Sequence, residues 1–314
     1  MNFLQILSIV APVFILVGAG YVFRHVRWMT PEADHTLLKL GVNVLLPALI
    51  ADTVLGNPLL AKASDLWFPP VLGFSLIALS MGIVGLMLAP LRLPHETSGA
   101  GIITAGVQNF GYMVIPLVDA LYDRETLGVL FIHNLGVEIA LWSLGVWVLA
   151  RKKESASWRR LISVPAVAVL CSGLLNLIHA NEWLPTVLRK SLHMMGQSAI
   201  PLALLLTGAT IYDQIRVSGD GRPKYAALSI ALIARLALLP LVLLAVARWL
   251  PMPTALRNVL VLQAAMPSAM MPVVICRHQG ADSKFCVQIV LLSTAFSLVT
   301  IPLWIKFGAA WVAG

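Results

Sequence analysis

Charged residues are scarce in this chain of 314 residues, since Asp, Glu, Lys and Arg together make up only 11% of it. An ordinary soluble domain carries about 25%, so this sequence has too few charges to coat the surface of one. Hydrophobic residues make up 59%, which excludes intrinsic disorder, because disordered segments combine low hydrophobicity with high charge. The composition is typical of a helical protein that crosses a lipid bilayer several times.

Cysteine is also rare, with three residues (Cys171, Cys276 and Cys286) and no CxxC pair. Neither a disulfide framework nor a zinc or other metal site is indicated. The GxxxxGK[ST] loop of ATP-driven proteins, the HExxH of metalloproteases and the GxSxG of serine hydrolases are all absent. We therefore expect neither an enzyme nor a bound cofactor. The net charge of +8 comes without a nucleic-acid-binding signature, so nucleic acid is not an expected partner.

Ten apolar stretches are long enough to span a membrane, which takes about 20 residues each. They lie at approximately 4–23, 36–56, 68–90, 97–121, 126–150, 161–180, 194–213, 225–249, 254–279 and 284–306. The loops on one side of these spans hold 14 Lys and Arg residues, and the loops on the other side hold 7. Since basic loops face the cytoplasm, we expect an all-α, multi-pass protein of the plasma (inner) membrane with both termini outside.

Prolines recur at a nearly constant offset in the two halves of the chain. Pro12 and Pro165 are 153 residues apart, Pro47 and Pro201 are 154 apart, and Pro116 and Pro272 are 156 apart. Five spans per half is an odd number, so the second copy would be inverted in the membrane, as in many transporters. We expect two five-helix repeats, 1–150 and 161–314, joined by a short basic cytoplasmic linker at 151–160.

The fourth and ninth spans carry helix breakers near their centres. The fourth contains Gly111 and Pro116 beside the amides Gln108 and Asn109, and the ninth contains Pro267, Ser268 and Pro272 after Gln263. Proline and glycine interrupt helices, and irregular backbone at this depth occurs only inside protein or beside a wet cavity. Two half-helix N-termini close together would attract a carboxylate.

The sequence resembles the auxin efflux carrier family, which includes plant auxin exporters and bacterial carriers of malonate and malate. The resemblance covers all ten spans and is most specific at Asn109-x6-Pro116-Leu117, at Met266-Pro267-x4-Pro272 and at Ile301-Pro302. It implies two inverted repeats whose fourth and ninth helices cross, with spans one, two, six and seven as a scaffold. It also implies that Asn109 contacts a substrate carboxylate, and it admits a homodimer. Plant members have glutamine where this chain has Ser268, which argues against auxin.

Ionisable groups within spans are candidates for function. Glu138 lies mid-span, four residues after Asn134 and near His133, so the three residues are candidates for binding a proton or a sodium ion. An alternative is that Glu138 pairs with Arg235, the one basic residue deep in a span. Asp52 lies late in the second span, either facing the outer vestibule or, as we favour, at the interface without a role.

These observations predict a secondary transporter that moves a small organic anion by alternating access. A carboxylate or dicarboxylate like malonate or malate is expected, with auxin-like acids left open. Transport would use an ion gradient (sodium or proton) or, without coupling, the membrane potential. The alternative is a membrane sensor or binding component that does not transport. The candidate substrate-binding residues are Asn109, Gln108, Tyr112, Pro116, Gln263, Pro267, Ser268, Pro272 and Asn43.

Overall fold

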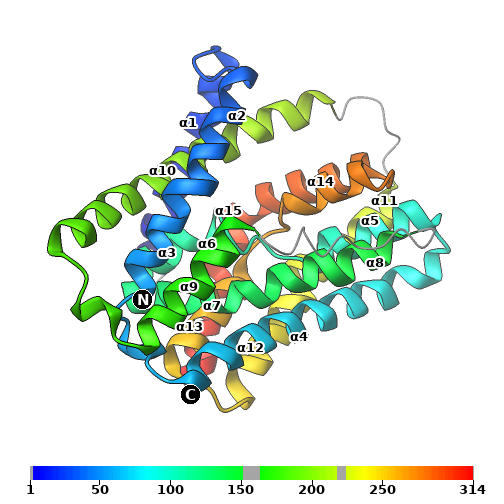
Figure 1. Ribbon diagram of the computed structural model, residues 1–314. Coiled ribbons are helices and arrows are strands. Elements are labelled where there is room, and N and C mark those ends of the chain that lie inside the picture. Colours follow the sequence, from blue (N-terminus) through cyan, green and yellow to red (C-terminus); the bar gives the residue numbers. More distant parts are fainter. Residues whose placement is uncertain (1–2, 151–162, 218–223, 314) are drawn as a thin grey trace.

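The computed structural model describes residues 3–150, 163–217 and 224–313, and this part of the chain is built from helices joined by short connections (Figure 1). No β-strand occurs among these residues, so the expected all-α class is confirmed. The expected linker at 151–160 lies outside the described residues.

The first half of the chain contains α1 to α8 in order. Their bounds are α1 (Phe3–His25), α2 (Pro31–Leu40), α3 (Leu46–Val54), α4 (Ala63–Leu88), α5 (His95–Gly106), α6 (Val114–Leu121), α7 (Arg124–Ala140) and α8 (Val146–Leu149). Two π-helical turns, η1 (Gly41–Leu45) and η4 (Leu141–Gly145), join α2 to α3 and α7 to α8 into continuous rods.

The second half contains α9 to α15. Their bounds are α9 (Val164–Leu177), α10 (Thr186–Val217), α11 (Tyr225–Ile233), α12 (Leu239–Trp249), α13 (Thr254–Ala265), α14 (Met271–His278) and α15 (Ser283–Ala313). A third π-helical turn, η7 (Ala234–Leu238), joins α11 to α12, and a short 3-10 helix, η6 (Ala180–Glu182), precedes α10.

Capping side chains explain where two of the helices begin. Asp123 precedes α7 and its carboxylate accepts a hydrogen bond from the Thr126 N–H at 2.7 Å. Ser163 precedes α9, and its hydroxyl accepts from the Ala166 N–H at 3.1 Å. Each cap satisfies one of the free N–H groups that a helix leaves in its first turn, so the start of each helix is fixed locally.

Seven helices of the described chain are long and apolar enough to cross a membrane: Leu4–His25, Pro31–Val54, Ala63–Leu91, Arg124–Leu149, Thr186–Arg216, Tyr225–Trp249 and Ser283–Val312. The other three expected spans are shorter as helices. Those at 97–121 and 254–279 are each interrupted, and the one at 161–180 contains α9, whose described length is 14 residues.

The helices pack in two groups. In the first helix group, α10 packs against α1 and α3, and α3 packs against α9. In the second helix group, α4 packs against α5 and α7, while α15 packs against α5, α11, α13 and α14. In Figure 1, α1, α2 and α10 lie at the upper left, whereas α4, α5, α8, α11 and α14 lie to the right. The groups meet where α1 contacts α6 and α15, and where α3 contacts α7.

Glycine allows the closest contacts within each group. A Cβ atom at Gly208 of α10 would lie 1.9 Å from the carbonyl oxygen of Val17 in α1. A Cβ at Gly136 of α7 would lie 1.7 Å from the carbonyl oxygen of Pro70 in α4. No side chain fits there, so small residues set the distance between these helix axes, as they do in many membrane helix pairs.

Candidate functional site

The two interrupted helices cross each other at their breaks. Between α5 and α6, and between α13 and α14, the chain is extended, and the two extended stretches run antiparallel. The Asn109 N–H donates to the Pro267 carbonyl at 2.7 Å, and the Ala269 N–H donates to the Val107 carbonyl at 3.0 Å. Each break therefore supplies backbone hydrogen bonds that the other lost, which satisfies the strict pairing requirement of a membrane interior.

Proline chemistry explains the position of the second break. Met266, the residue before Pro267, has φ −73° and ψ 144°, the extended conformation that a following proline favours. Pro272 is the second residue of α14, where the missing N–H costs no hydrogen bond. In the first break, Pro116 is the third residue of α6. Both prolines thus lie at the starts of half-helices, directly after the crossover.

A chain of amide side chains fastens the crossover to α7. Gln108 Nε2 donates to Gln263 Oε1 at 2.7 Å, and Gln263 Nε2 donates to Asn134 Oδ1 at 2.7 Å. Asn134 Nδ2 in turn donates to the Phe110 carbonyl at 2.6 Å. Gln108 and Gln263 are 1% and 0% exposed, so these bonds are shielded from water. The structure brings together two predicted substrate residues and one predicted coupling residue in a single network.

Three more predicted residues line the crossover. The half-buried Asn109 uses Oδ1 to accept from the Met113 N–H at 3.4 Å, just before α6 begins. Tyr112 is half-buried between them in sequence. Ser268 is 1% exposed, and its N–H donates to Ser293 Oγ at 3.2 Å.

Two buried polar side-chain atoms at the crossover lack a hydrogen-bond partner. Ser268 Oγ and Gln108 Oε1 make no hydrogen bond within the described part of the chain. Buried polar atoms are nearly always paired, and each exception calls for an explanation such as a ligand or water. The crossover therefore has unused hydrogen-bonding capacity next to the beginnings of α6 and α14.

The predicted coupling residues do not form one cluster. His133 is fully buried, and neither ring nitrogen makes a well-formed hydrogen bond among the described residues. Glu138 is half-buried and interacts with Ser163 at the start of α9. The alternative ion pair of Glu138 with Arg235 is absent from the described chain: Arg235 is 0% exposed, and all three guanidinium nitrogens lack partners there.

Asn43 is the outlying member of the predicted set. It lies in η1, which packs against α10, and its side chain is exposed. No hydrogen bond joins it to the crossover among the described contacts. The shared spacing to a proline, which suggested a role for Asn43, therefore does not bring it into the amide network.

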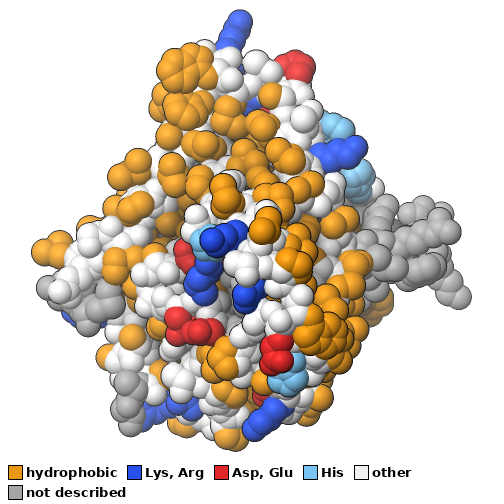
Figure 2. All heavy atoms as spheres, turned by 60° about the vertical axis from the view of Figure 1, so that its left-hand side comes forward, with side chains coloured by type: hydrophobic (Ala, Val, Ile, Leu, Met, Phe, Trp, Pro, Cys, Tyr) orange, Lys and Arg blue, Asp and Glu red, His pale blue; other side chains and the backbone are white. Residues whose placement is uncertain are grey.

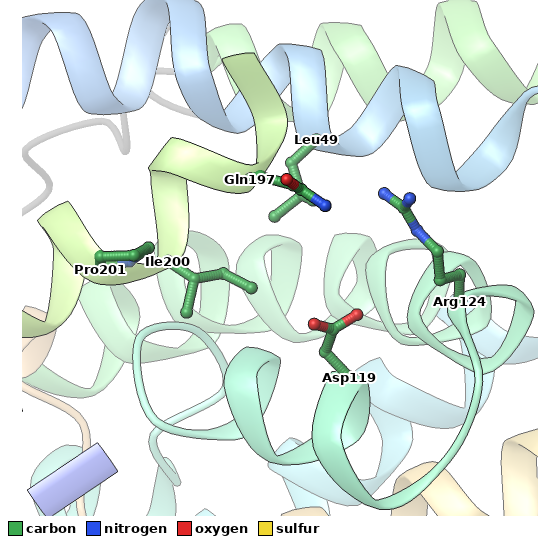
Figure 3. Close-up of a pocket in the computed structure, with 6 residues that line it drawn as sticks. All are labelled: Leu49, Asp119, Arg124, Gln197, Ile200 and Pro201. Carbon is green, nitrogen blue, oxygen red and sulfur yellow. The ribbon is translucent and has the colours of Figure 1, made fainter. Parts of the chain in front are cut away.

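A cavity of about 470 Å³ lies between the two helix groups. Figure 3 shows Asp119 of α6 and Arg124 of α7 on one side and Leu49 of α3 with Gln197, Ile200 and Pro201 of α10 on the other. The Asp119 carboxylate and the Arg124 guanidinium both point toward the space below Gln197. A second cavity of about 290 Å³ adjoins Asp52. Neither cavity is lined by the predicted crossover residues.

Three ionisable residues form a cluster next to these two cavities. Arg124, the first residue of α7, forms an ion pair with Asp52 of α3 through Nη2. Its Nη1 lies 2.6 Å from Nδ1 of His193 in α10, and that same nitrogen lies 3.1 Å from Asp52 Oδ2. The Asp52 side chain is only 13% exposed. Asp52 is therefore not isolated at the interface, because it pairs with Arg124 of the second helix group and His193 of the first; whether it has a functional role stays a prediction.

The helices α3, α6 and α9 terminate at the same end of the bundle. We call this end the Asp52 face. Figure 2 shows charged side chains of both signs and histidine gathered in the middle of one side of the molecule, surrounded by hydrophobic side chains. Sequence reasoning missed the Asp52, Arg124 and His193 cluster, because its members lie in three separate helices. The one available signal was that each is an ionisable residue close to a span end.

The opposite end, the Asp282 face, has its own polar contact. Lys224 Nζ lies 2.8 Å from Asp282 Oδ2, Thr97 Oγ1 donates to the same oxygen at 3.0 Å, and the Phe285 N–H donates to Oδ1 at 3.1 Å. Burial alone would raise the pKa of Asp282, but the hydrogen bonds from Lys224, Phe285 and Thr97 outweigh it and hold the pKa below its ordinary value. This contact joins α5, α11 and α15.

Comparisons with known proteins agree with these features. The family described as membrane transport protein matches residues 5–159 and 149–305. An uncharacterized transporter of Methanocaldococcus jannaschii is 24% identical over 305 residues, which cover 95% of this chain and 97% of the relative. An uncharacterized transporter of Methanothermobacter thermautotrophicus is 26% identical over 308 residues, which cover 97% and 99%. The chain belongs to the membrane transport protein family, which covers the auxin efflux carriers that its sequence resembles.

Proposed function

We propose that this membrane transporter is a secondary carrier of a small organic anion that works by alternating access around the crossover. The substrate class is a carboxylate or dicarboxylate like malonate or malate, with auxin-like acids as a further option. The proposed substrate contacts are Asn109, Gln108, Tyr112, Pro116, Gln263, Pro267, Ser268 and Pro272.

The observation that carries this proposal is the crossover with its unpaired polar atoms. Ser268 Oγ and Gln108 Oε1 are buried without described partners, although the Gln263 amide beside them makes a hydrogen bond through its oxygen and another through its nitrogen. The adjacent α6 and α14 start at Val114 and Met271, and helix N-termini favour anions. A carboxylate with a hydroxyl or second carboxyl group suits a place that combines N–H donors with a hydroxyl and an amide oxygen.

The packing of the helices supports two inverted five-span repeats, 1–150 and 161–314. The contact of α1 with α10 is matched by that of α9 with α3, and the contact of α4 with α5 is matched by that of α12 with α13. Likewise, α7 packs on α13 as α15 packs on α5. Gln108 and Gln263, which are 155 residues apart, face each other at the centre. In this arrangement the ten predicted spans consist of seven long helices, α9 and two interrupted helices.

The proposed topology follows from the basic loops. It places the Asp52 face outside the plasma (inner) membrane together with both termini, and the Asp282 face in the cytoplasm. The first helix group would act as the scaffold, and the second, which contains the crossover, would move against it. The cavity of about 470 Å³ lies on this boundary, as a route to the crossover requires.

For the coupling ion, sodium or a proton, we keep Glu138, Asn134 and His133 as candidates. Asn134 Oδ1 accepts one hydrogen bond from Gln263 and has a second lone pair for a cation. Glu138→Gln is expected to change the pH or sodium dependence of flux, and an unchanged dependence would remove Glu138 from the site.

The test is uptake of radiolabelled malonate, malate and indole acetate into proteoliposomes, with and without sodium and pH gradients. Asn109→Ala should reduce uptake and the substrate-induced rise in melting temperature. Asn258→Ala is the matched control, because Asn258 is a half-buried asparagine of α13 without a described hydrogen bond. Equal uptake by Asn109→Ala and the native protein would contradict the crossover assignment. Binding without uptake of any compound would favour the sensor alternative.

A further inference from the structure

Arg124 is the charged residue that joins the two helix groups at the Asp52 face, beside the hydrogen bond of Asn57 Nδ2 to the Glu125 carbonyl at 2.9 Å. It begins α7 in the second group, whereas Asp52 in α3 and His193 in α10 belong to the first. The Arg124 side chain is 41% exposed and that of His193 is 39% exposed, so water and protons reach the cluster. The contact also spans the boundary where the cavity lies. Separation of the groups at this face requires that Arg124 lose its partners and that the hydrogen bond between Asn57 and Glu125 break.

One nitrogen of His193 has two contacts that cannot both form. Nδ1 lies 2.6 Å from Arg124 Nη1 and 3.1 Å from Asp52 Oδ2. A guanidinium only donates hydrogen bonds and a carboxylate only accepts them. The Arg124 contact therefore needs a bare Nδ1 on a neutral ring, whereas the Asp52 contact needs a protonated Nδ1. The proton on this nitrogen selects which of the two residues His193 binds.

The other ring nitrogen can keep its proton in both states if the Gln197 amide is turned over. His193 Nε2 lies 3.0 Å from Nε2 of Gln197, one turn further along α10. The amide oxygen and nitrogen exchange places by a half-turn of the group, so the oxygen can accept from Nε2–H. A neutral ring with its proton on Nε2 is the form that accepts from Arg124 through Nδ1, and the protonated ring retains the bond to Gln197.

We propose that His193 and Asp52 form a proton-binding site that controls whether Arg124 ties the two helix groups together at the Asp52 face. With His193 neutral, Arg124 bridges Asp52 and the ring. With His193 protonated, Nδ1–H donates to Asp52, and two cations compete for one carboxylate at a distance where like charges repel. Arg124 is then released toward the cavity, where Asp119 faces it (Figure 3).

No other charged group near the cluster pairs with Asp52 in place of Arg124 or His193 in the described part of the chain. The charged and titratable groups on the adjoining elements are Asp119 on α6, Asp123 and Glu125 beside Arg124, His179 and Glu182 before α10, and Arg189 and Lys190 on α10. Arg189 Nη1 donates to Asn181 Oδ1 at 3.2 Å instead of to Asp52. On the Asp282 face, Arg277 Nη2 of the second group donates to Gln214 Oε1 of the first at 2.6 Å, and this acceptor does not titrate.

The inference rests on the proposed function and adds the proton as the coupling ion. Because the Asp52 face is placed outside, external acid would open the outer entrance, and a proton and the anion would enter from the same side. Histidine is the side chain whose charge changes between about pH 5 and pH 8. The site at His193 is separate from the Glu138 candidates, so variants distinguish the two.

The experiment measures the separation of the groups instead of flux. Spin labels are placed on the full-length protein in nanodiscs through Ala120→Cys at the end of α6 and Val187→Cys at the start of α10. The exposed Cys171 is changed to Ser, while Cys276 and Cys286 are buried and remain. Distances are recorded by pulsed electron resonance from about pH 5 to pH 8. The labels should move apart at acid pH, and they should come together again at alkaline pH.

Variants give each step its own result. His193→Gln can still accept from Arg124 but cannot become charged, so the labels should stay close at every pH. Arg124→Gln should keep them apart at every pH. His35→Gln, an exposed histidine of α2, should follow the native pH profile. A pH response that survives in His193→Gln, or a native protein without a response, overturns the inference. A normal pH response in a protein that carries no anion refutes the proposed function but leaves the proton site standing.

Discussion

Replacing Gln263 by leucine tests whether the amide network holds the crossover together. Gln263 accepts from Gln108 and donates to Asn134, each at 2.7 Å, and is 0% exposed. Leucine is close in size but makes neither bond. The change leaves Gln108 Nε2 and Asn134 Oδ1 without partners, and each orphaned buried group costs about 1–3 kcal/mol. Hydrogen bonds between membrane helices average about 0.6 kcal/mol, so the low end applies and we expect a loss of roughly 2–4 kcal/mol.

The assay is the melting temperature of the purified protein, followed by the fluorescence of its nine tryptophans. A loss of this size should lower the melting temperature by roughly 4–8 °C. Gln288→Leu is the matched control, since Gln288 of α15 is half-buried without a described hydrogen bond, and it should change little.

A double variant checks the reasoning more strictly. When Gln108 also becomes leucine, the orphaned Nε2 atom disappears, so the double variant should lose less stability than the two single variants together. Strictly additive losses, or a melting temperature of Gln263→Leu equal to that of the native protein, would refute the claim that these amides depend on each other.

Three further predictions follow from packing and charge. Gly136→Val should destabilise the protein by about 1–3 kcal/mol, because its Cβ meets the Pro70 carbonyl, whereas Gly18→Val, with open space around it, should change the melting temperature little. Asp282→Asn should lower the stability at neutral pH. The native protein keeps the contribution of the charged carboxylate above about pH 4 and loses it as the pH falls through the depressed pKa of Asp282. Melting temperatures measured over a series of acid pH values should therefore converge for the two proteins. Arg235→Met should raise the melting temperature, because an apolar group of similar length replaces a buried charge without a described partner; a lower value would mean that Arg235 has an anionic partner.

The sequence was sufficient to predict the helical class and the two interrupted helices. Pro267 and Pro272 have local effects on the backbone, so their consequences can be read from the chain itself. The exact ends differed, because the first helix ends at Gly106, well before Pro116, which starts the next half-helix instead of breaking the first. The prolines thus predicted the region of each interruption correctly, but not the residue at which the helical hydrogen bonds stop.

The side-chain partners could not be predicted, because they depend on how each helix is rotated about its axis. Glu138 and Arg235 both lie within predicted spans, yet they do not pair in the described structure. Arg235 itself lies in the π-helical turn η7, where an extra residue shifts the side-chain register away from that of a regular α-helix. The Asp52 contacts with Arg124 and His193 join residues 72 and 141 positions apart, a separation over which local patterns carry no information.

The paired breaks at the crossover also bear on how the protein is made. The Asn109 N–H and the Val107 carbonyl bond to Pro267 and Ala269, which are synthesised roughly 160 residues later. At about 5–20 residues per second, the ribosome needs roughly 10–30 s to produce them. During that interval the first half waits in the insertion machinery or the bilayer with backbone groups that lack their final partners. The crossover can therefore close only after synthesis of the second half, which makes it a late step in biogenesis, and a chain truncated before Pro267 would remain a substrate for membrane quality control.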